Sequence, residues 1–469
     1  MVFASPIFLL LFLPLVFAAY AVAPRAARNP VLLVASVLFY MWGEGWFVGL
    51  VMTSVLANWG FGLAIGNADL PRTRRRWLTA AVALNLLTLA VFKYANFAVA
   101  NLNEIALAIG RHRIQWDDVP LPLGISFFTF HAISYVVDVY KRNARAERRL
   151  FDFALYILLF PQLIAGPIIR WRDFSDQIAG RDWRMADVAY GLRRLLLGLG
   201  KKVLIANTLG RVADLIFDLP PRQLPTGLAW LGLVCYSFQI YFDFSGYCDI
   251  GLGAAYLFGI RLALNFRQPY LSSSPQEFWQ RWHITLSQWI RDYLYIPLGG
   301  SEGGAMRSAA VLIVVMGLAG LWHGASWTFA VWGVGWALVI LLWRMFGAAL
   351  APMKAASWFL TFMLAMLLWT FFRAPDIAQA FAYCSALFGL RSAGTAAVPP
   401  DGAGGLLVLL GCLSLLALHA LEAQLYTRKA VLLLKRYDGL FVRSAFVAVS
   451  IWLLLLPKMQ HTPFIYFRF

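Results

Sequence analysis

The longest charge-free stretch of the chain limits the environment in which the protein can fold. Between Ser308 and Trp343 there is no Asp, Glu, Lys or Arg, whereas about 20 apolar residues suffice for a helix to cross a bilayer. Of all 469 residues, 61% are hydrophobic and 13% are charged, which is about half the charged fraction of soluble proteins. The sequence therefore excludes a string of soluble domains and predicts a polytopic membrane protein.

Apolar runs of spanning length recur along the whole chain. We expect the first 23 residues to be a retained span, because no basic segment precedes them; a cleaved signal peptide is the alternative. Further candidate spans lie at residues 30–47, 48–66, 77–98, 121–140, 151–170, 187–208, 226–242, 246–264, 308–326, 328–343, 355–372, 403–421 and 441–457. Several are short or interrupted, so we predict an all-α protein with ten to twelve transmembrane or re-entrant helices.

The basic excess of the sequence fits the same class of protein. Forty Lys and Arg against 23 Asp and Glu give a formal net charge of +17. The abundance of Trp and Phe in charge-poor runs favours lipid over nucleic acid as the reason. Three basic clusters, at residues 25–28, 72–76 and 141–149, are separated by pairs of candidate spans, so all three can face the cytoplasm.

One segment between the apolar runs has a different character. From Leu264 to Ser308 the sequence mixes Arg, Asp, Glu and His with Trp and Tyr, so it is too polar for lipid and too aromatic for a solvated linker. Pro269, Pro275 and Pro297 divide it into short helical pieces. We expect these pieces at the headgroup level or in a protein-lined cavity that reaches into the membrane.

His323 is the most informative single residue. It lies inside the charge-free stretch, in GLAGLWHGASW, and an ionisable residue at membrane depth indicates a functional site. A dry environment favours its neutral imidazole, which can accept a proton. An interhelical hydrogen bond is the structural alternative. Gly317, Gly320 and Gly324 would allow another backbone or a ligand to approach closely.

Other polar residues in apolar surroundings admit two interpretations. Asp243 and Asp249 are either tunnel-lining residues or members of buried pairs with Arg. Taken alone, His283 and His131 fit structural roles, and His419 fits a packing residue without polar neighbours.

Common signatures of soluble enzymes are missing. There is no phosphate-binding P-loop, HExxH, GxSxG or dinucleotide-binding GxGxxG motif. The cysteines at 235, 248, 384 and 412 stand singly, so neither a disulfide framework nor a metal site is indicated. A proton-coupled transporter, which also uses intramembrane ionisable residues, remains an alternative class.

Several blocks of sequence together resemble a known family. They are YSFQIYFDFSGYCDIGLG, NFRQPY, FWQRWHITLSQWIRDYLYIPLGG and GLWHGASWTFAVWG, flanked by PLGISFFTFHAISYVVDVYKR, FPQLIAGPIIR, TFFRAPD and a terminal FIYFRF. In this order they closely resemble the membrane-bound O-acyltransferase family, in particular its bacterial alginate O-acetylation branch. The resemblance implies one membrane domain over residues 1–469 with its core motifs in residues 235–335.

The resemblance also implies an activity and a site. The family's buried catalytic His falls on His323 and its second characteristic His on His283, in a helical bundle around a central tunnel or funnel. His323 would act as the general base, and His283 would either orient the donor or acceptor or stabilise developing negative charge. The donor would be cytosolic acetyl-CoA, with no bound cofactor. The acetyl group would pass to a periplasmic partner acetyltransferase acting on an exopolysaccharide, and the protein would lie in the inner membrane of a Gram-negative bacterium. Further candidate substrate-binding or tunnel-lining residues are Asp243, Tyr247, Arg281, Trp282, Asp292 and Trp322.

The sequence departs from the family pattern at a few positions. FAVWGVGWA lacks a His that follows this motif in many relatives, Cys248 replaces a Ser, and His131 replaces a Gln. Direct transfer and an acyl-enzyme relay are both open, although Ser245 and Cys248 are not expected to carry the acyl group. Transfer of D-alanyl or another acyl group to a different envelope polymer is the alternative within the enzyme class.

Overall fold

The computed structural model describes residues 3–163, 166–350, 352–390 and 402–425, and the regular structure in these ranges is helical throughout. The predicted all-α class is therefore confirmed. The chain forms two compact units, residues 1–197 with 247–263 and residues 198–246 with 264–469. The assignment of residues 1–469 to one domain stays a prediction.

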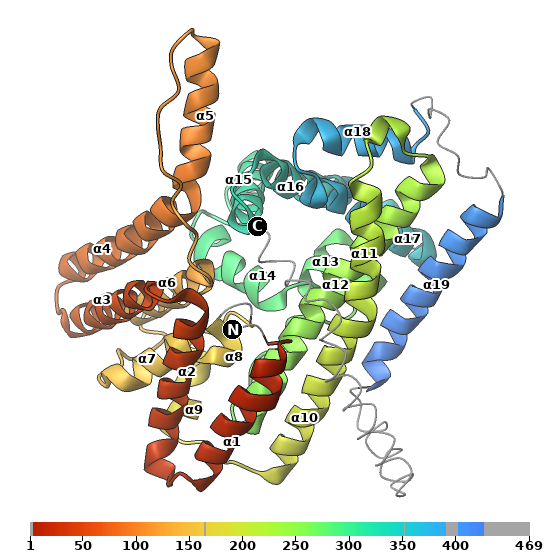
Figure 1. Cartoon of the computed structure of the whole chain (residues 1–469). Helices are drawn as coiled ribbons and strands as arrows, with labels where there is room; N and C mark the ends of the chain where they lie inside the picture. The colour runs from red at the N-terminus through yellow and green to blue at the C-terminus, as the bar shows by residue number, and fades with distance from the viewer. Residues whose placement is uncertain (1–2, 164–165, 351, 391–401, 426–469) are drawn as a thin grey trace, which may run out of the picture. The chain divides into compact units, whose positions relative to one another are not determined.

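The first unit contains the N-terminal helices. Within it, α3, α4 and α6 pack on one another (Figure 1), and the side-chain amides of Asn58 and Asn85 join α3 to α4 through hydrogen bonds of 3.3 and 2.7 Å. The helices are α1 (Leu13–Val22), α2 (Arg28–Glu44), α3 (Phe47–Asn67), α4 (Pro71–Leu89), α5 (Ala95–Ala108), α6 (Ile125–Tyr140), α7 (Leu150–Leu158), α8 (Phe160–Leu163), α9 (Trp171–Ala179) and most of α10 (Met185–Gly200), with π-helical turns at Phe8–Phe12 and Ala90–Tyr94 and a 3-10 turn at Arg25–Ala27.

The second unit contains the C-terminal helices and the polar aromatic segment. Its helices are α11 (Asn207–Phe217), α13 (Pro275–Arg281), α14 (Ile284–Ile290), α15 (Ala305–His323), α16 (Trp327–Leu350), α17 (Lys354–Arg373), α18 (Ile377–Leu387) and α19 (Gly402–Leu425). Shorter turns are π-helical at Lys201–Ala206 and Arg291–Tyr295 and 3-10 at Pro221–Gln223 and Pro269–Leu271. Helix α12 (Thr226–Leu257) contributes residues to both units.

Two of the predicted span boundaries are wrong. The separate spans at 226–242 and 246–264 are replaced by one continuous helix, α12, because Asp243, the acid between them, is paired with Lys202 and no proline interrupts the run. The predicted span at 151–170 is broken into α7 and α8, since Pro161 cannot donate the amide hydrogen bond that would continue the helix.

Within the part of the chain that the structure describes, five helical segments are long and apolar enough to cross a membrane. They are Phe47–Asn67, Pro71–Ala108, Ala305–His323, Trp327–Leu350 and Lys354–Arg373, and they agree with the predicted spans at 48–66, 77–98, 308–326, 328–343 and 355–372. The protein is therefore a multi-pass membrane protein, while the count of ten to twelve and the central tunnel stay predictions. The expected span at 441–457, His461 and the terminal FIYFRF lie outside the described residues.

The polar aromatic segment is built from short helices, as predicted. Ser274 caps α13, since its hydroxyl accepts the Glu277 amide at 3.1 Å, and Pro275 occupies the first turn. Helix α14 starts directly after His283. Two helix starts in so short a sequence keep both helices below spanning length.

In the second unit, helices α15 and α16 pack closely and lie side by side in Figure 1. A Cβ atom on Gly320 would lie 2.1 Å from the carbonyl oxygen of Phe329, and one on Gly333 would lie 2.1 Å from that of Met316. The two backbones therefore touch, as small residues allow in membrane helices. The expected close approach at Gly320 is confirmed.

We predict that Gly320→Ala destabilises the protein strongly, by about 3 kcal/mol or enough to prevent folding, because the new methyl group meets backbone that cannot move aside. Gly317→Ala is the matched control, since its Cβ would meet only Val334 at an ordinary 3.5 Å. Thermal unfolding of detergent-solubilised protein, followed by fluorescence-detected size-exclusion chromatography, measures both. Equal midpoints for the two variants would contradict the contact.

Candidate active site

His323 ends α15 in an enclosure of aromatic rings. Its side chain is almost fully buried, at 4% exposed. Trp322, Trp332 on α16 and Phe372 on α17 present rings at centroid distances of 4.9, 5.1 and 5.3 Å, each in an edge-type arrangement. Three helices therefore surround one imidazole and exclude water from it.

His283 lies in the same unit and shares a neighbour with His323. It is fully buried, and its ring packs edge-on against Phe244 of α12 at 4.7 Å. The Trp322 ring lies 6.3 Å from the His283 ring and 4.9 Å from that of His323. The structure thus places Trp322 in contact with both candidate histidines.

The backbone at His283 has an uncommon conformation. His283 adopts φ 41° and ψ 55°, in the left-handed region, which is costly for a residue with a side chain. Such strain persists where surrounding contacts hold it, often at functional sites. His283 lies outside the five candidate spans, and burial lowers the pKa of its imidazole to about 3, so the ring is neutral at pH 7.

Asn265 provides the contacts that hold this turn. Its side-chain oxygen accepts the Thr285 amide at 3.1 Å and the Thr285 hydroxyl at 2.7 Å, and it lies 3.3 Å from Nδ1 of His283. Its backbone carbonyl accepts the Ile284 amide at 3.0 Å. One residue from outside α14 therefore caps the start of that helix.

The remaining candidates divide into packing residues and paired charges. Trp282 is fully buried and packs on Trp369 at 4.9 Å, so it supports the wall beside His283. Arg281 pairs with Glu277 at 2.5 Å and Asp292 with its neighbour Arg291 at 2.7 Å, and neither pair is fully buried.

Two candidates from α12 lie in different surroundings. Asp243, in the second unit, pairs with buried Lys202 at 2.6 Å. Tyr247 belongs to the first unit, where its ring stacks on Phe3 at 4.7 Å. His131 is also in the first unit and accepts the Ile169 amide at 3.2 Å, which fits the structural interpretation.

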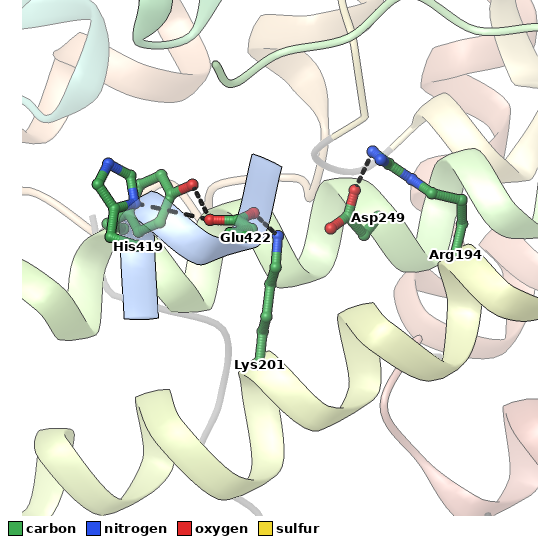
Figure 2. Close-up of polar contacts among 6 residues, drawn as sticks. Arg194, Lys201, Asp249, His419 and Glu422 are labelled. Carbon is green, nitrogen blue, oxygen red and sulfur yellow. Dashed lines mark hydrogen bonds and ion pairs between the residues drawn. The ribbon is translucent and has the colours of Figure 1, made fainter. Parts of the chain in front are cut away.

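Buried charges form pairs whose cationic partners could not be named from the sequence. In the first unit Arg194 contacts Asp249 (Figure 2), which favours the buried-pair interpretation of that acid. In the second unit Lys201 contacts Glu422 of α19, whose other oxygen accepts the Tyr241 hydroxyl at 2.6 Å. The adjacent lysines at 201 and 202, inside a predicted apolar span, were the signal available in the sequence.

The prediction that His419 has no polar neighbours is wrong. Its Nδ1 lies 3.6 Å from Glu422, one helical turn further along α19 (Figure 2). Its ring also packs edge-on against Tyr241 at 4.4 Å. His419 therefore belongs to the Lys201–Glu422 cluster.

Comparison with known proteins defines the class of protein to which this site belongs. Residues 32–374 match the membrane-bound O-acyltransferase family, and the chain belongs to this family. It is 44% identical over 391 residues to a probable alginate O-acetylase AlgI of Azotobacter vinelandii, covering 83% of this chain and 78% of that protein. The corresponding Pseudomonas aeruginosa protein is 42% identical, covering 83% and 75%. A Helicobacter pylori peptidoglycan O-acetyltransferase is 34% identical, covering 83% and 80%.

The protein is therefore a membrane O-acyltransferase, as the sequence blocks implied. The matched family region contains both histidines, Asn265 and the aromatic enclosure. It ends before α19, so the Glu422 cluster lies partly outside it.

We predict that Asp249→Asn lowers the folding stability by about 3–5 kcal/mol, because it removes the negative charge that buried Arg194 contacts. Asp182→Asn is the matched control, since its pair with Arg184 is exposed and exposed pairs contribute little. Thermal unfolding in detergent compares the two variants. If the unfolding midpoint falls strongly in both variants, or in neither, the Arg194–Asp249 pair is not a buried charge interaction.

Proposed function

We propose that the protein transfers acetyl groups from cytosolic acetyl-CoA toward a cell-surface polysaccharide. A periplasmic acetyltransferase would complete the transfer, and the protein would act in the inner membrane of a Gram-negative bacterium. The relatives named as alginate O-acetylases support acetyl as the acyl group and a polysaccharide as the final acceptor. The relative named as a peptidoglycan O-acetyltransferase supports acetyl with a different envelope polymer.

The chemistry assigned to His323 is general-base catalysis. Its neutral imidazole accepts the proton of the attacking hydroxyl while the hydroxyl oxygen bonds to the thioester carbonyl carbon. The carbon–sulfur bond then breaks, and the CoA thiolate takes up that proton. The products are an O-acetyl ester and CoA, and such proton transfer accelerates reactions by about 100- to 10,000-fold.

The observation that carries this proposal is the aromatic enclosure of His323. An imidazole among Trp322, Trp332 and Phe372 has little water around it to hydrolyse the thioester or to solvate a charge. Water exclusion strengthens the interactions in a reaction site. A residue that served only helix packing would not require rings from three separate helices around one polar group.

His283 and Trp322 extend the site beyond the base. Because the Trp322 ring contacts both histidines, a substrate that binds next to one imidazole also lies close to the other. We assign His283 to substrate binding and His323 to proton transfer. Asp243, already paired with Lys202, is assigned a structural role.

The test of the base is turnover of radiolabelled acetyl-CoA by protein in nanodiscs, with membrane extract of the host as the acceptor source. We expect His323→Ala to lose about 100- to 10,000-fold of the transfer rate. His112→Ala, in an exposed loop, is the matched control and should retain the wild-type rate. Equal rates in all three proteins, each monodisperse by size exclusion, would remove His323 as the base.

Assays of the same protein in nanodiscs and in sealed proteoliposomes distinguish the enzyme from a transporter. An acyltransferase releases free CoA in proportion to the label that appears on the acceptor, because one carbon–sulfur bond breaks for each ester formed. Label that crosses a sealed proteoliposome while CoA stays acylated would instead identify a conduit without covalent chemistry. A wild-type protein that is active only with an acyl carrier protein as donor would contradict acetyl-CoA.

A further inference from the structure

We propose that Asn265 is a positioning residue that fixes the proton of His283 on Nδ1, so that Nε2 accepts a hydrogen bond from a hydroxyl of the acyl acceptor. The proposal deepens the proposed function, because it assigns His283 to the acceptor rather than to the developing negative charge. It rests on hydrogen-bond geometry around one side-chain oxygen.

The identity of that oxygen follows from Thr285. The Thr285 backbone amide can only donate, and it points at the Asn265 side chain at 3.1 Å. The Asn265 atom that faces it must therefore be the carbonyl oxygen, since the amide nitrogen would present a second donor. The Thr285 hydroxyl, 2.7 Å from the same atom, donates to it as well. The amide orientation of Asn265 is thus determined by a backbone group.

The tautomer of His283 follows from the oxygen. A carbonyl oxygen is only an acceptor, so Nδ1 of His283, 3.3 Å away, must carry the proton. In a neutral imidazole the other nitrogen then has a lone pair and no proton. In metal-binding histidines, a hydrogen bond on one ring nitrogen fixes the tautomer and the ring orientation in the same way.

The remaining nitrogen is buried and unused by the protein. Within the described ranges Nε2 of His283 has no hydrogen-bond partner, although the residue is 0% exposed. A buried polar atom without a partner destabilises the fold, and His283 also has a left-handed backbone conformation. A hydrogen-bond donor supplied by substrate would offset that cost.

The chemistry of Nε2 selects the substrate group. An unprotonated nitrogen cannot donate to a developing oxyanion, so His283 does not stabilise the thioester carbonyl. It can accept from a hydroxyl, which the acyl acceptor must have in order to be O-acylated. The surrounding rings of Phe244 and Trp322 fit an apolar face of the same substrate.

The first test reads the tautomer without any activity. Protein with 15N-labelled histidine in nanodiscs is studied by solid-state NMR, and the His283 signals are assigned by difference with His283→Gln. We expect Nδ1 protonated and Nε2 unprotonated in the wild type and in Asn265→Asp, whose carboxylate also accepts from Nδ1. Asn265→Leu should give a mixture of tautomers or the reverse one.

Thr285→Val separates the two contacts to Asn265, because it removes the hydroxyl and keeps the backbone amide. It should keep the wild-type tautomer. A protonated Nε2 in the wild type, or an unchanged single tautomer in a folded Asn265→Leu protein, would overturn the proposal. Both results are independent of whether acetyl-CoA is the donor, so they do not depend on the proposed function.

The second test is the pH profile of transfer. The Asn265→Asp substitution would add a negative charge beside the imidazole of His283 and raise the pKa of that imidazole. As the pH is lowered, the variant should therefore lose activity at a higher pH than the wild type does. The charged groups on the adjoining elements are the Lys202–Asp243 pair, Arg267, the Glu277–Arg281 pair, the Arg291–Asp292 pair and the imidazole of His323. Because the wild type and Asn265→Asp share these charged groups, a difference between their pH profiles reports the substitution at residue 265.

The pH profile also has a kinetic readout for the substrate group. The KM for the acceptor should rise in Asn265→Leu. In Asn265→Asp, measured above the shifted pKa, the KM for the acceptor should stay at the wild-type value. The KM for acetyl-CoA should be unchanged in both variants. A rise confined to the donor KM would overturn the assignment to the acceptor. An unshifted pH profile in a folded Asn265→Asp protein would overturn the positioning role.

Discussion

The backbone contact between α15 and α16 is the constraint on which the candidate site depends. Gly320 and Gly333 leave no room for a side chain between the helices, and lipid supplies no hydrophobic force to hold them together, so close packing must do so. His323 follows Gly320 by one turn, and Trp332 precedes Gly333. A shift of either helix therefore displaces the imidazole and one of the rings that enclose it.

The buried acids and the two candidate histidines have different kinds of neighbours. Asp243, Asp249 and Glu422 are buried, and each contacts a cation, because an ionised group in a dry interior must be compensated. The two histidines are surrounded by aromatic rings instead. A neutral imidazole tolerates burial at lower cost than a carboxylate, because no charge is removed from water. The paired acids compensate charge inside the scaffold, and the two histidines are the residues to which we assign the chemistry.

Sequence patterns predicted the features that depend on local composition. The charge-free stretch predicted α15 and α16, the prolines predicted the short helices around His283, and His323 stood out as an ionisable residue among apolar ones. Contacts between distant residues had no such signal. Asn265 and His283 are 18 positions apart and Lys201 and Glu422 are 221 apart, so only the folded chain identifies them as partners. Trp322 was named as a candidate and adjoins His323 in the sequence, but its contact with His283 is seen only in the folded chain.

The most direct test of the account is a structure of the protein in nanodiscs with acetonyl-CoA, in which a methylene separates the sulfur from the carbonyl carbon and the acyl group cannot leave. The account predicts that the acetonyl carbonyl lies in the enclosure of Trp322, Trp332 and Phe372, within reach of His323, and that Nδ1 of His283 still contacts Asn265. An analogue bound with its carbonyl in contact with neither histidine would contradict the assignment of the active site.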